Sequence, residues 1–440
     1  MTLTDPAGAV VRAVRDALDG GAVYAPQPRL SDAAVPAGTA LVLRTSGSTG
    51  NPREVALSAA ALRASAEATH DRLGGPGRWL LVLPPTHVAG VQVVNRTVVA
   101  GTDVRVGDLA PFTPGAFAAL ARDFLDSPGA DGSGRAYVSI VPTQLHRLVA
   151  AADGGDGTDG GDGDDGAGLA ALARFDAVLV GGAATPAPLL ARARAAGVRA
   201  VTTYGMSETS GGCVYDGVPL AGVRVRLADA AGPGAATGVV ELSGPVLAEG
   251  YVGDPDATAA AFRTDPDGTR WFRTSDLGRL DDGRLTILGR ADDVILTGGV
   301  NVAPAAVEDA IAGHLAVRGT PGEACVVGVP DDEWGQAVVA VLALPGHAPA
   351  VGAPEHRTPG DGTPGDTAPG VPLPLADADG ELLAGLRTAV GGRLGAPAAP
   401  RRVYVTPALP TRGPGKVDRR AVRDAVVRAE RNQGREPVRP

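Results

Sequence analysis

Short apolar runs alternate with alanine-rich stretches in the first half of the chain, and this alternation limits the fold more than any other feature of the sequence. The predicted strands cover residues 79–83, 136–141, 177–180 and 198–201. The predicted helices cover residues 58–73, 115–125 and 186–196. Strands that alternate with helices build a sheet with helices packed on its faces. We therefore predict an α/β fold.

The pattern changes after residue 221, where strands and turns replace the helices. Residues 223–227 and 239–242 are candidate strands, which indicates a β-rich subdomain over about residues 221–290. Such a subdomain would complete a large N-terminal domain covering residues 1–291. The change in pattern therefore places the first domain boundary close to residue 291.

A smaller α+β domain is predicted over residues 292–440, with candidate strands at 324–329 and 337–344. A chain of 440 residues exceeds what one hydrophobic core commonly supports, which agrees with two domains. Residues 153–168 are nearly all Gly and Asp, and residues 345–373 are rich in Pro, Gly and Ala. Neither stretch can bury enough apolar surface to offset its ordering entropy, so we predict two surface loops.

Charge and cysteine content narrow the classes of function. A net charge of −9 argues against a nucleic-acid partner. The two cysteines, Cys213 and Cys325, are too few for a disulfide framework and fit small core positions in a reducing compartment. No apolar run reaches the length of a membrane span, and the N-terminus lacks the apolar segment of a signal peptide. We therefore expect a cytoplasmic enzyme.

A turn rich in hydroxyls and glycine follows the apolar run at residues 40–43. The turn consists of Thr45, Ser46, Gly47, Ser48, Thr49 and Gly50. Glycines let backbone N–H groups approach anionic oxygens, and the hydroxyls and the nearby Arg53 add donors, so the turn suits a polyphosphate. An ordinary Ser/Gly loop has the same composition. The turn is not the common P-loop, because Asn51 follows Gly50 where that motif needs lysine.

Three later segments carry side chains suited to a nucleotide. In residues 203–209, Tyr204 can stack on a base and Glu208 is an oxygen ligand suited to Mg²⁺. Asp276 can accept hydrogen bonds from ribose hydroxyls, and Arg290 can reach the same sugar or a phosphate. Lys416 lies on a Pro/Gly loop near the end of the chain. Taken singly, each segment also has a purely structural interpretation, as a turn, a salt bridge or a solvated side chain.

In this order the four segments resemble the motifs of the adenylate-forming ligases, the superfamily of acyl-CoA synthetases, luciferases and peptide-synthetase adenylation domains. The resemblance implies ATP and coenzyme A as co-substrates, Mg²⁺ as cofactor, and Glu208 as the metal ligand. It makes Asp292 the hinge between the domains and Lys416 the cation that meets the α-phosphate during adenylation. The residues that it assigns to ATP and AMP are Thr45, Ser46, Gly47, Ser48, Thr49, Gly50, Arg53, Gly182, Ala183, Tyr204, Gly205, Met206, Ser207, Thr209, Asp276 and Arg290.

Two segments bear on the acyl substrate, residues 83–90 and residues 141–145, and both resemble the o-succinylbenzoate–CoA ligases of menaquinone biosynthesis. That resemblance implies that His87 and Ser207 lie beside the acyl group. The substrate has two carboxylates, and Arg96 is the candidate partner of the one that is not activated. Only about 44 residues precede the phosphate turn, so we expect a short form with a reduced N-terminal domain.

The predicted reaction joins a carboxylate to ATP as an acyl-adenylate and then transfers the acyl group to coenzyme A. One alternative is a stand-alone adenylation domain that loads an amino or aryl acid onto a carrier protein. Such domains usually place an Asp near residues 85–87, and none stands there. A second alternative is a catalytically silent adenylate-binding protein, which the joint presence of Glu208, Asp276, Arg290 and Lys416 disfavours. The assembly state stays open, with a homodimer among the alternatives.

Overall fold

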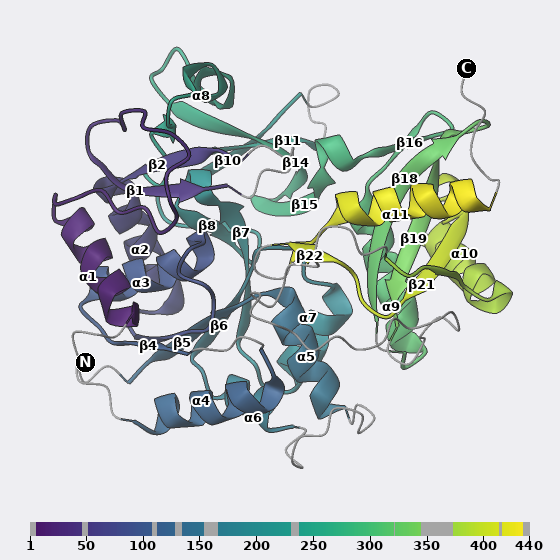
Figure 1. Ribbon diagram of the computed structural model, residues 1–440, viewed down its shortest axis with the longest axis horizontal. Coiled ribbons are helices and arrows are strands. Elements are labelled where there is room, and N and C mark those ends of the chain that lie inside the picture. Colours follow the sequence, from purple (N-terminus) through teal and green to yellow (C-terminus); the bar gives the residue numbers. More distant parts are fainter. Residues whose placement is uncertain are drawn as a thin grey trace. The chain divides into compact units, whose positions relative to one another are not determined.

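The computed structural model describes residues 6–45, 52–107, 112–127, 134–153, 166–229, 237–320, 322–344, 373–412 and 416–433 (Figure 1). The chain divides into two compact units. Unit 1 consists of Met1–Thr185, Arg192–Thr274 and Gly278–Thr286, and unit 2 consists of Pro186–Ala191, Ser275–Leu277 and Ile287–Pro440.

A seven-stranded sheet with the order β4-β3-β5-β6-β7-β8-β9 forms the centre of unit 1. The first five strands of this order run parallel, and β8 and β9 are antiparallel to their neighbours. The bounds are β3 (Arg78–Leu81), β4 (Val104–Val106), β5 (Ala136–Ile140), β6 (Ala177–Val180), β7 (Ala200–Met206), β8 (Gly211–Tyr215) and β9 (Val218–Pro219). Strands of a parallel sheet are covered on both faces, which explains why β3, β5 and β6 are buried along their whole length and mostly apolar, with Arg78 and Ser139 as the polar exceptions.

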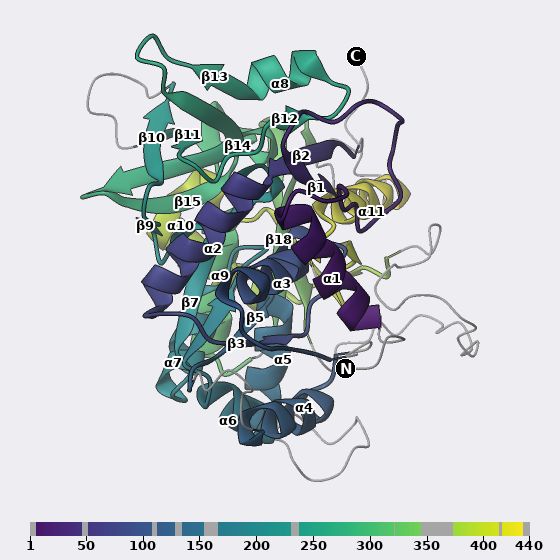
Figure 2. The same cartoon turned by 90° about the vertical axis from the view of Figure 1, so that its left-hand side faces the viewer.

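The helices of unit 1 form two groups. Helices α1 (Pro6–Leu18), α2 (Ala59–Leu73) and α3 (Val88–Ala100) contact one another, and α3 also packs on β3 and β5. Helices α4 (Pro114–Asp126), α5 (Pro142–Ala152) and α6 (Ala167–Ala173) form the second group (Figures 1 and 2). Local signals set their ends: Ser58 and Thr113 cap α2 and α4, and Gly74 and Gly101 end α2 and α3 in the left-handed conformation.

Two further sheets account for the β-rich region. One has the order β1-β2-β12, from β1 (Thr39–Arg44), β2 (Glu54–Ser58) and β12 (Gly250–Tyr251). The other has the order β10-β11-β14-β13, with β15 also paired to β14. Its strands are β10 (Arg224–Ala228), β11 (Thr237–Ser243), β13 (Phe262–Thr264), β14 (Arg270–Asp281) and β15 (Arg284–Arg290), and the short helix α8 (Pro255–Ala261) precedes β13.

Unit 2 is built on a four-stranded sheet with the order β18-β19-β21-β20. Alternate residues of its strands face opposite sides: Val326 and Val338 pack with α9 and α10, while Val327 and Val339 pack with α11. The sheet therefore lies between helices. The elements of this unit are β16 (Ile295–Thr297), β17 (Val300–Val302), α9 (Pro304–Val317), β18 (Glu323–Asp331), β19 (Gly335–Ala343), β20 (Ala376–Asp377), α10 (Gly380–Leu394), β21 (Arg402–Thr406), β22 (Thr411–Arg412), β23 (Lys416–Val417) and α11 (Arg419–Asn432).

The predicted α/β class is confirmed, and each predicted strand and helix has a counterpart within a few residues, with α7 (Ala187–Ala195) at the third predicted helix. One loop prediction was too long, because Ala167 and Gly168 begin α6, where Leu169 and Leu172 are buried. Residues 154–165 of that stretch, and residues 345–372, lie outside the described residues. Both cysteines are free and buried, as expected. Among the described helices, none combines the length and apolar character needed to cross a membrane.

Candidate functional site

The phosphate turn connects the antiparallel strands β1 and β2, and two hydrogen bonds close its base. The Thr45 backbone N–H donates to the Arg53 carbonyl at 2.8 Å, and the Arg53 N–H donates to the Thr45 hydroxyl at 3.1 Å. Ser46, Gly47, Ser48, Thr49 and Gly50 lie outside the described residues. The structure therefore fixes both ends of the turn at the edge of the small β1-β2-β12 sheet.

The segment that carries Tyr204 and Glu208 runs from β7 through the short 3₁₀ turn η1 (Ser207–Thr209) into β8. Thr209 is fully buried, and its hydroxyl accepts from the Met206 N–H at 2.9 Å and lies 2.8 Å from the Gly211 carbonyl oxygen. These backbone contacts hold the turn closed. Gly205 is required here because a Cβ would lie 2.1 Å from the Gly211 carbonyl oxygen.

Glu208 is nearly buried, with 8% of its surface exposed. The Tyr251 hydroxyl donates to its Oε1 at 2.9 Å. Burial, followed by the charge and hydrogen bond of Glu208, raises the pKa of Tyr251, so the phenol stays protonated at neutral pH. The ring of the same tyrosine lies under the Arg53 guanidinium, 5.1 Å from its central carbon. Sequence reasoning missed Tyr251, because a single Gly-Tyr pair in a β-rich region carries no chemical signal.

Gly182 and Ala183 follow β6 on an exposed turn. Gly182 has φ +88°, a left-handed conformation that glycine adopts without strain. Gly181 before it needs a small residue, because a Cβ there would lie 2.2 Å from the Thr203 hydroxyl oxygen. The structure thus gives this corner a packing role, and its contact with adenine stays a prediction.

Asp276 and Arg290 come together within unit 2. The Arg290 guanidinium lies 3.9 Å from Asp276 and forms two hydrogen bonds, of 2.8 and 2.9 Å, with the carboxylate of Asp292. Burial lowers the pKa of Arg290, but Asp292, Asp276 and Asp293 together outweigh that effect and raise it. The residue predicted as the hinge is therefore held by the arginine predicted to reach the ribose.

Lys416 begins β23, where its backbone pairs with Arg412 of β22. Three residues later, Arg419 at the start of α11 lies at the centre of a charged cluster. Its guanidinium contacts Glu308 of α9 and lies 3.5 Å from Asp293. Arg419, three residues after the predicted catalytic Lys416, therefore pairs with the segment that contains Asp292, the predicted hinge.

His87 precedes α3, and Arg96 lies nine residues further along the same helix. Arg96 is 4% exposed, with its guanidinium 5.1 Å from the centre of the Trp79 ring and one nitrogen 3.2 Å from the Tyr215 hydroxyl. Its Nε has no hydrogen-bond partner among the residues that the structure describes. Within the described part of the chain, no carboxylate forms an ion pair with Arg96. Arg96 is therefore a buried cation that pairs with no carboxylate of the described ranges.

Further polar atoms are buried around this cation. Gln92 of α3 and His70 of α2 each bury a side-chain nitrogen that has no hydrogen-bond partner in the described part of the chain. The Gln92 side chain lies close to Gly211, where an added Cβ would be 2.9 Å from it. The same hypothetical Cβ would lie 3.7 Å from Val88, next to His87. The first turns of α3 therefore border the turn that carries Glu208, which brings the predicted acyl and metal residues into one part of unit 1.

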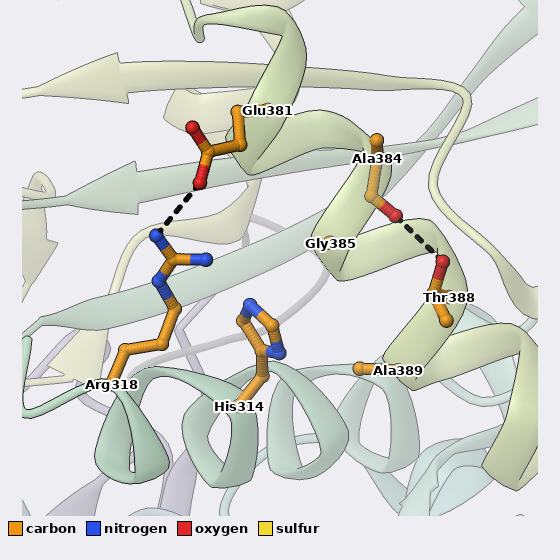
Figure 3. Close-up of a pocket in the computed structure, with 7 residues that line it drawn as sticks. All are labelled: His314, Arg318, Glu381, Ala384, Gly385, Thr388 and Ala389. Atoms are coloured by element: carbon orange, nitrogen blue, oxygen red, sulfur yellow. Dashed lines mark hydrogen bonds and ion pairs between the residues drawn. The ribbon is translucent and has the colours of Figure 1, made fainter.

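A separate hollow of about 420 Å³ lies on unit 2 between α9 and α10 (Figure 3). Arg318 and Glu381 form an ion pair of 3.2 Å across it, and His314 lies beside them. None of the predicted site residues lines this hollow.

Comparison with known proteins identifies the family of this chain. The family model for the AMP-binding enzyme matches residues 11–252. The chain belongs to the AMP-binding enzyme family. A probable 2-succinylbenzoate–CoA ligase from Mycobacterium tuberculosis is 43% identical over 392 residues, covering 87% of this chain and 83% of the relative. The 2-succinylbenzoate–CoA ligase of Bacillus velezensis is 31% identical over 70% of this chain and 59% of its own length.

Solved structures show the same fold. The amide bond synthetase McbA of Marinactinospora thermotolerans has a TM-score of 0.65 at 27% identity, covering 88% of this chain and 70% of its own. The o-succinylbenzoate–CoA synthetase of Bacillus subtilis, solved with its acyl-adenylate, has a TM-score of 0.62 at 24% identity, covering 88% and 69%. The predicted membership of the adenylate-forming superfamily is thus confirmed, while the roles of individual site residues stay predictions.

Acid should destabilise this AMP-binding enzyme through His70. Burial and then Arg96 lower the pKa of His70 from 6.5 to about 4, so the folded protein takes up its proton later than the unfolded chain. Stability is therefore lost as the pH falls from about 6.5 toward 4, by on the order of 3 kcal/mol. His70→Gln should flatten this part of the stability profile in urea unfolding, and His146→Gln on α5 should not. Profiles of the same slope in wild-type protein and His70→Gln would contradict the assignment.

Removal of the Arg419 ion pair, three residues after Lys416, should lower the stability of unit 2. Arg419→Ala leaves Glu308 without its cation, and we expect a loss of about 2 kcal/mol, reduced from the cost at a fully buried pair because both side chains are partly exposed. Arg420→Ala changes an exposed neighbour on the same helix and should cost less than about 0.5 kcal/mol. Thiol labelling of the buried Cys325, which lies against Arg419, measures the opening of this unit. Equal labelling rates for the two variants would contradict this stabilising role of Arg419.

Proposed function

We propose that the chain is an ATP-dependent 2-succinylbenzoate–CoA ligase. The single observation that carries the substrate assignment is the buried guanidinium of Arg96, which has no ion-pair partner within the described residues and lies on the helix that His87 precedes. The 43% identity with a probable ligase of that name supports the same assignment. A substrate with two carboxylates can be activated at one of them and held at the other.

An uncompensated buried cation argues for an anionic ligand. Taking a charge out of water costs several kcal/mol unless a partner repays it. Tyr215 contributes one hydrogen bond, and the Trp79 ring contributes a cation–π contact, but neither carries a negative charge. A planar guanidinium pairs with a carboxylate through two parallel hydrogen bonds, which also fixes the orientation of the bound acid.

Magnesium fits the residues present. No group of three or more His, Cys, Asp and Glu side chains that could hold a metal ion occurs among the described residues. Mg²⁺ does not need one, because it commonly binds through one or two carboxylates, substrate phosphates and water. The nearly buried Glu208 next to the phosphate turn matches that donor set. When bound, Mg²⁺ would neutralise part of the phosphate charge.

In the proposed mechanism the carboxylate attacks the α-phosphorus of ATP, which forms the acyl-adenylate and releases pyrophosphate. Arg53 and the phosphate turn hold the triphosphate, and Asp276 with Arg290 holds the ribose. Lys416 offsets negative charge as it accumulates on the reacting groups. The thiol of coenzyme A then displaces AMP and forms the thioester. A rotation about Asp292 between the two steps, a cytoplasmic location and a homodimer remain predictions.

A carboxylate screen tests this proposal. Purified protein is incubated with ATP, MgCl₂, coenzyme A and one acid at a time, and the thioester is detected by mass. Product from 2-succinylbenzoate, but not from fatty or amino acids, is the expected result, and Lys416→Ala should lose it. Pyrophosphate release with amino acids but no coenzyme A thioester would favour carrier-protein loading instead. Absence of pyrophosphate with every acid would favour a silent adenylate-binding protein.

Arg96 should determine recognition of the second carboxylate. Arg96→Gln should raise the KM for 2-succinylbenzoate by roughly 10- to 100-fold, because a charge-assisted pair is lost. The analogue 3-benzoylpropionate keeps the succinyl arm but lacks the ring carboxylate, and its KM should stay nearly unchanged. Arg78→Gln is a matched control, since Arg78 is also buried but bonds only main-chain carbonyls of Phe124 and Ser127. The same rise in KM for both acids would sink the assignment.

A further inference from the structure

Residues 53–55, at the start of β2, lie beside β12, the strand that contains Tyr251. Val55 pairs with Tyr251 across the antiparallel β2–β12 ladder. Arg53 lies two residues before Val55 and directly precedes the first residue of β2. The contact between the Arg53 guanidinium and the Tyr251 ring follows from this register. The Arg53 cation at the base of the phosphate turn therefore lies over the Tyr251 ring.

Tyr251 itself is held by its backbone. The strand that contains it bonds to β2 on one side, through Glu249 N–H to Ala56 at 2.9 Å and Val252 N–H to Glu54 at 2.8 Å. Its own N–H donates to the Thr258 hydroxyl of α8 at 2.9 Å. The Ala248 N–H donates to the carbonyl of Glu208 at 2.9 Å, which ties the same segment to the η1 turn. The tyrosine is therefore braced between the phosphate turn and the predicted metal ligand.

Asp254 completes the arrangement around Arg53. One carboxylate oxygen caps α8 by accepting from the Ala257 N–H at 3.0 Å, and the other lies 3.7 Å from the Arg53 Nε. Both side chains of this pair are about half exposed, so the pair contributes little to folding. Its effect is geometric, because the capped carboxylate and the tyrosine ring constrain the guanidinium from two directions.

We propose that Tyr251 is a positioning residue for the metal–triphosphate complex, orienting the Glu208 carboxylate with its hydroxyl and the Arg53 guanidinium with its ring. This inference rests on the proposed ATP-dependent function. It separates two parts of one side chain: the hydroxyl acts on the divalent cation through Glu208, and the ring acts on the phosphates through Arg53. A tyrosine that only filled space would not produce this division.

Binding measurements separate these two effects without the need for turnover. Mn²⁺ is used as the probe cation in paramagnetic resonance with ATP present, and ATP binding without divalent cation is measured by calorimetry. Tyr251→Phe keeps the ring and removes the hydroxyl, so we expect about tenfold weaker Mn²⁺ binding with unchanged metal-free ATP binding. Arg53→Lys keeps the charge and loses the planar stack, so we expect metal-free ATP binding to weaken by about two- to fivefold with Mn²⁺ binding unchanged. Tyr251→Leu should show both losses.

A double-mutant cycle and a matched tyrosine serve as controls. In a Glu208→Gln background, Tyr251→Phe should add no further loss of Mn²⁺ binding. Tyr137→Phe removes another tyrosine hydroxyl of unit 1, one that bonds the Leu73 and Gly75 carbonyls, and should leave both affinities unchanged. Wild-type Mn²⁺ affinity in Tyr251→Phe, or equal losses in Tyr137→Phe, overturns this inference and leaves the ligase proposal standing. Wild-type protein that binds no ATP under either condition overturns both.

Discussion

The pairing of β12 with β2 is the constraint on which the candidate site of unit 1 depends. β12 has only two residues, yet it links the strand after the phosphate turn to the η1 turn that carries Glu208. These parts are about 150 residues apart in the chain, so no local propensity can bring them together. Main-chain hydrogen bonds on both sides of Tyr251 do so, and they leave its side chain in contact with a cation and a carboxylate at once.

Much of the fold could be predicted because it follows from local patterns. The parallel strands β3, β5 and β6 are mostly apolar and buried, and caps such as Thr113 mark the helix ends. The strands of unit 2 could be located for a similar reason, since β18 and β19 are apolar on both faces and helices cover each side. The start of α6 was missed because Ala167 and Gly168 continue a Gly-rich run, and only the buried leucines that follow distinguish the helix.

The candidate site was less predictable, because its chemistry depends on contacts between distant residues. Arg96 could be selected as a substrate partner by its position in a motif, but its burial, with no ion pair to a carboxylate of the described residues, appears only in three dimensions. Arg419 and Arg420 are adjacent residues of the same type, and nothing in the sequence distinguishes them. The structure separates them: Arg419 is paired with Glu308 and Arg420 is exposed. In each case the tertiary environment, which the sequence does not display, decides whether a charge is structural, functional or merely solvated.

The buried polar atoms along α3 have a common physical explanation. Arg96, His70 and Gln92 each bury a nitrogen that finds no hydrogen-bond partner among the described residues, and such groups are uncommon in a protein core. Burial and then the Arg96 charge lower the pKa of His70 and keep its imidazole neutral, so the folded state loses stability as the pH falls. A bound ligand can offset such destabilisation, and an acid with a free second carboxylate would supply the missing negative charge. The buried polar groups around Arg96 are therefore those that would make unit 1 selective for such an acid.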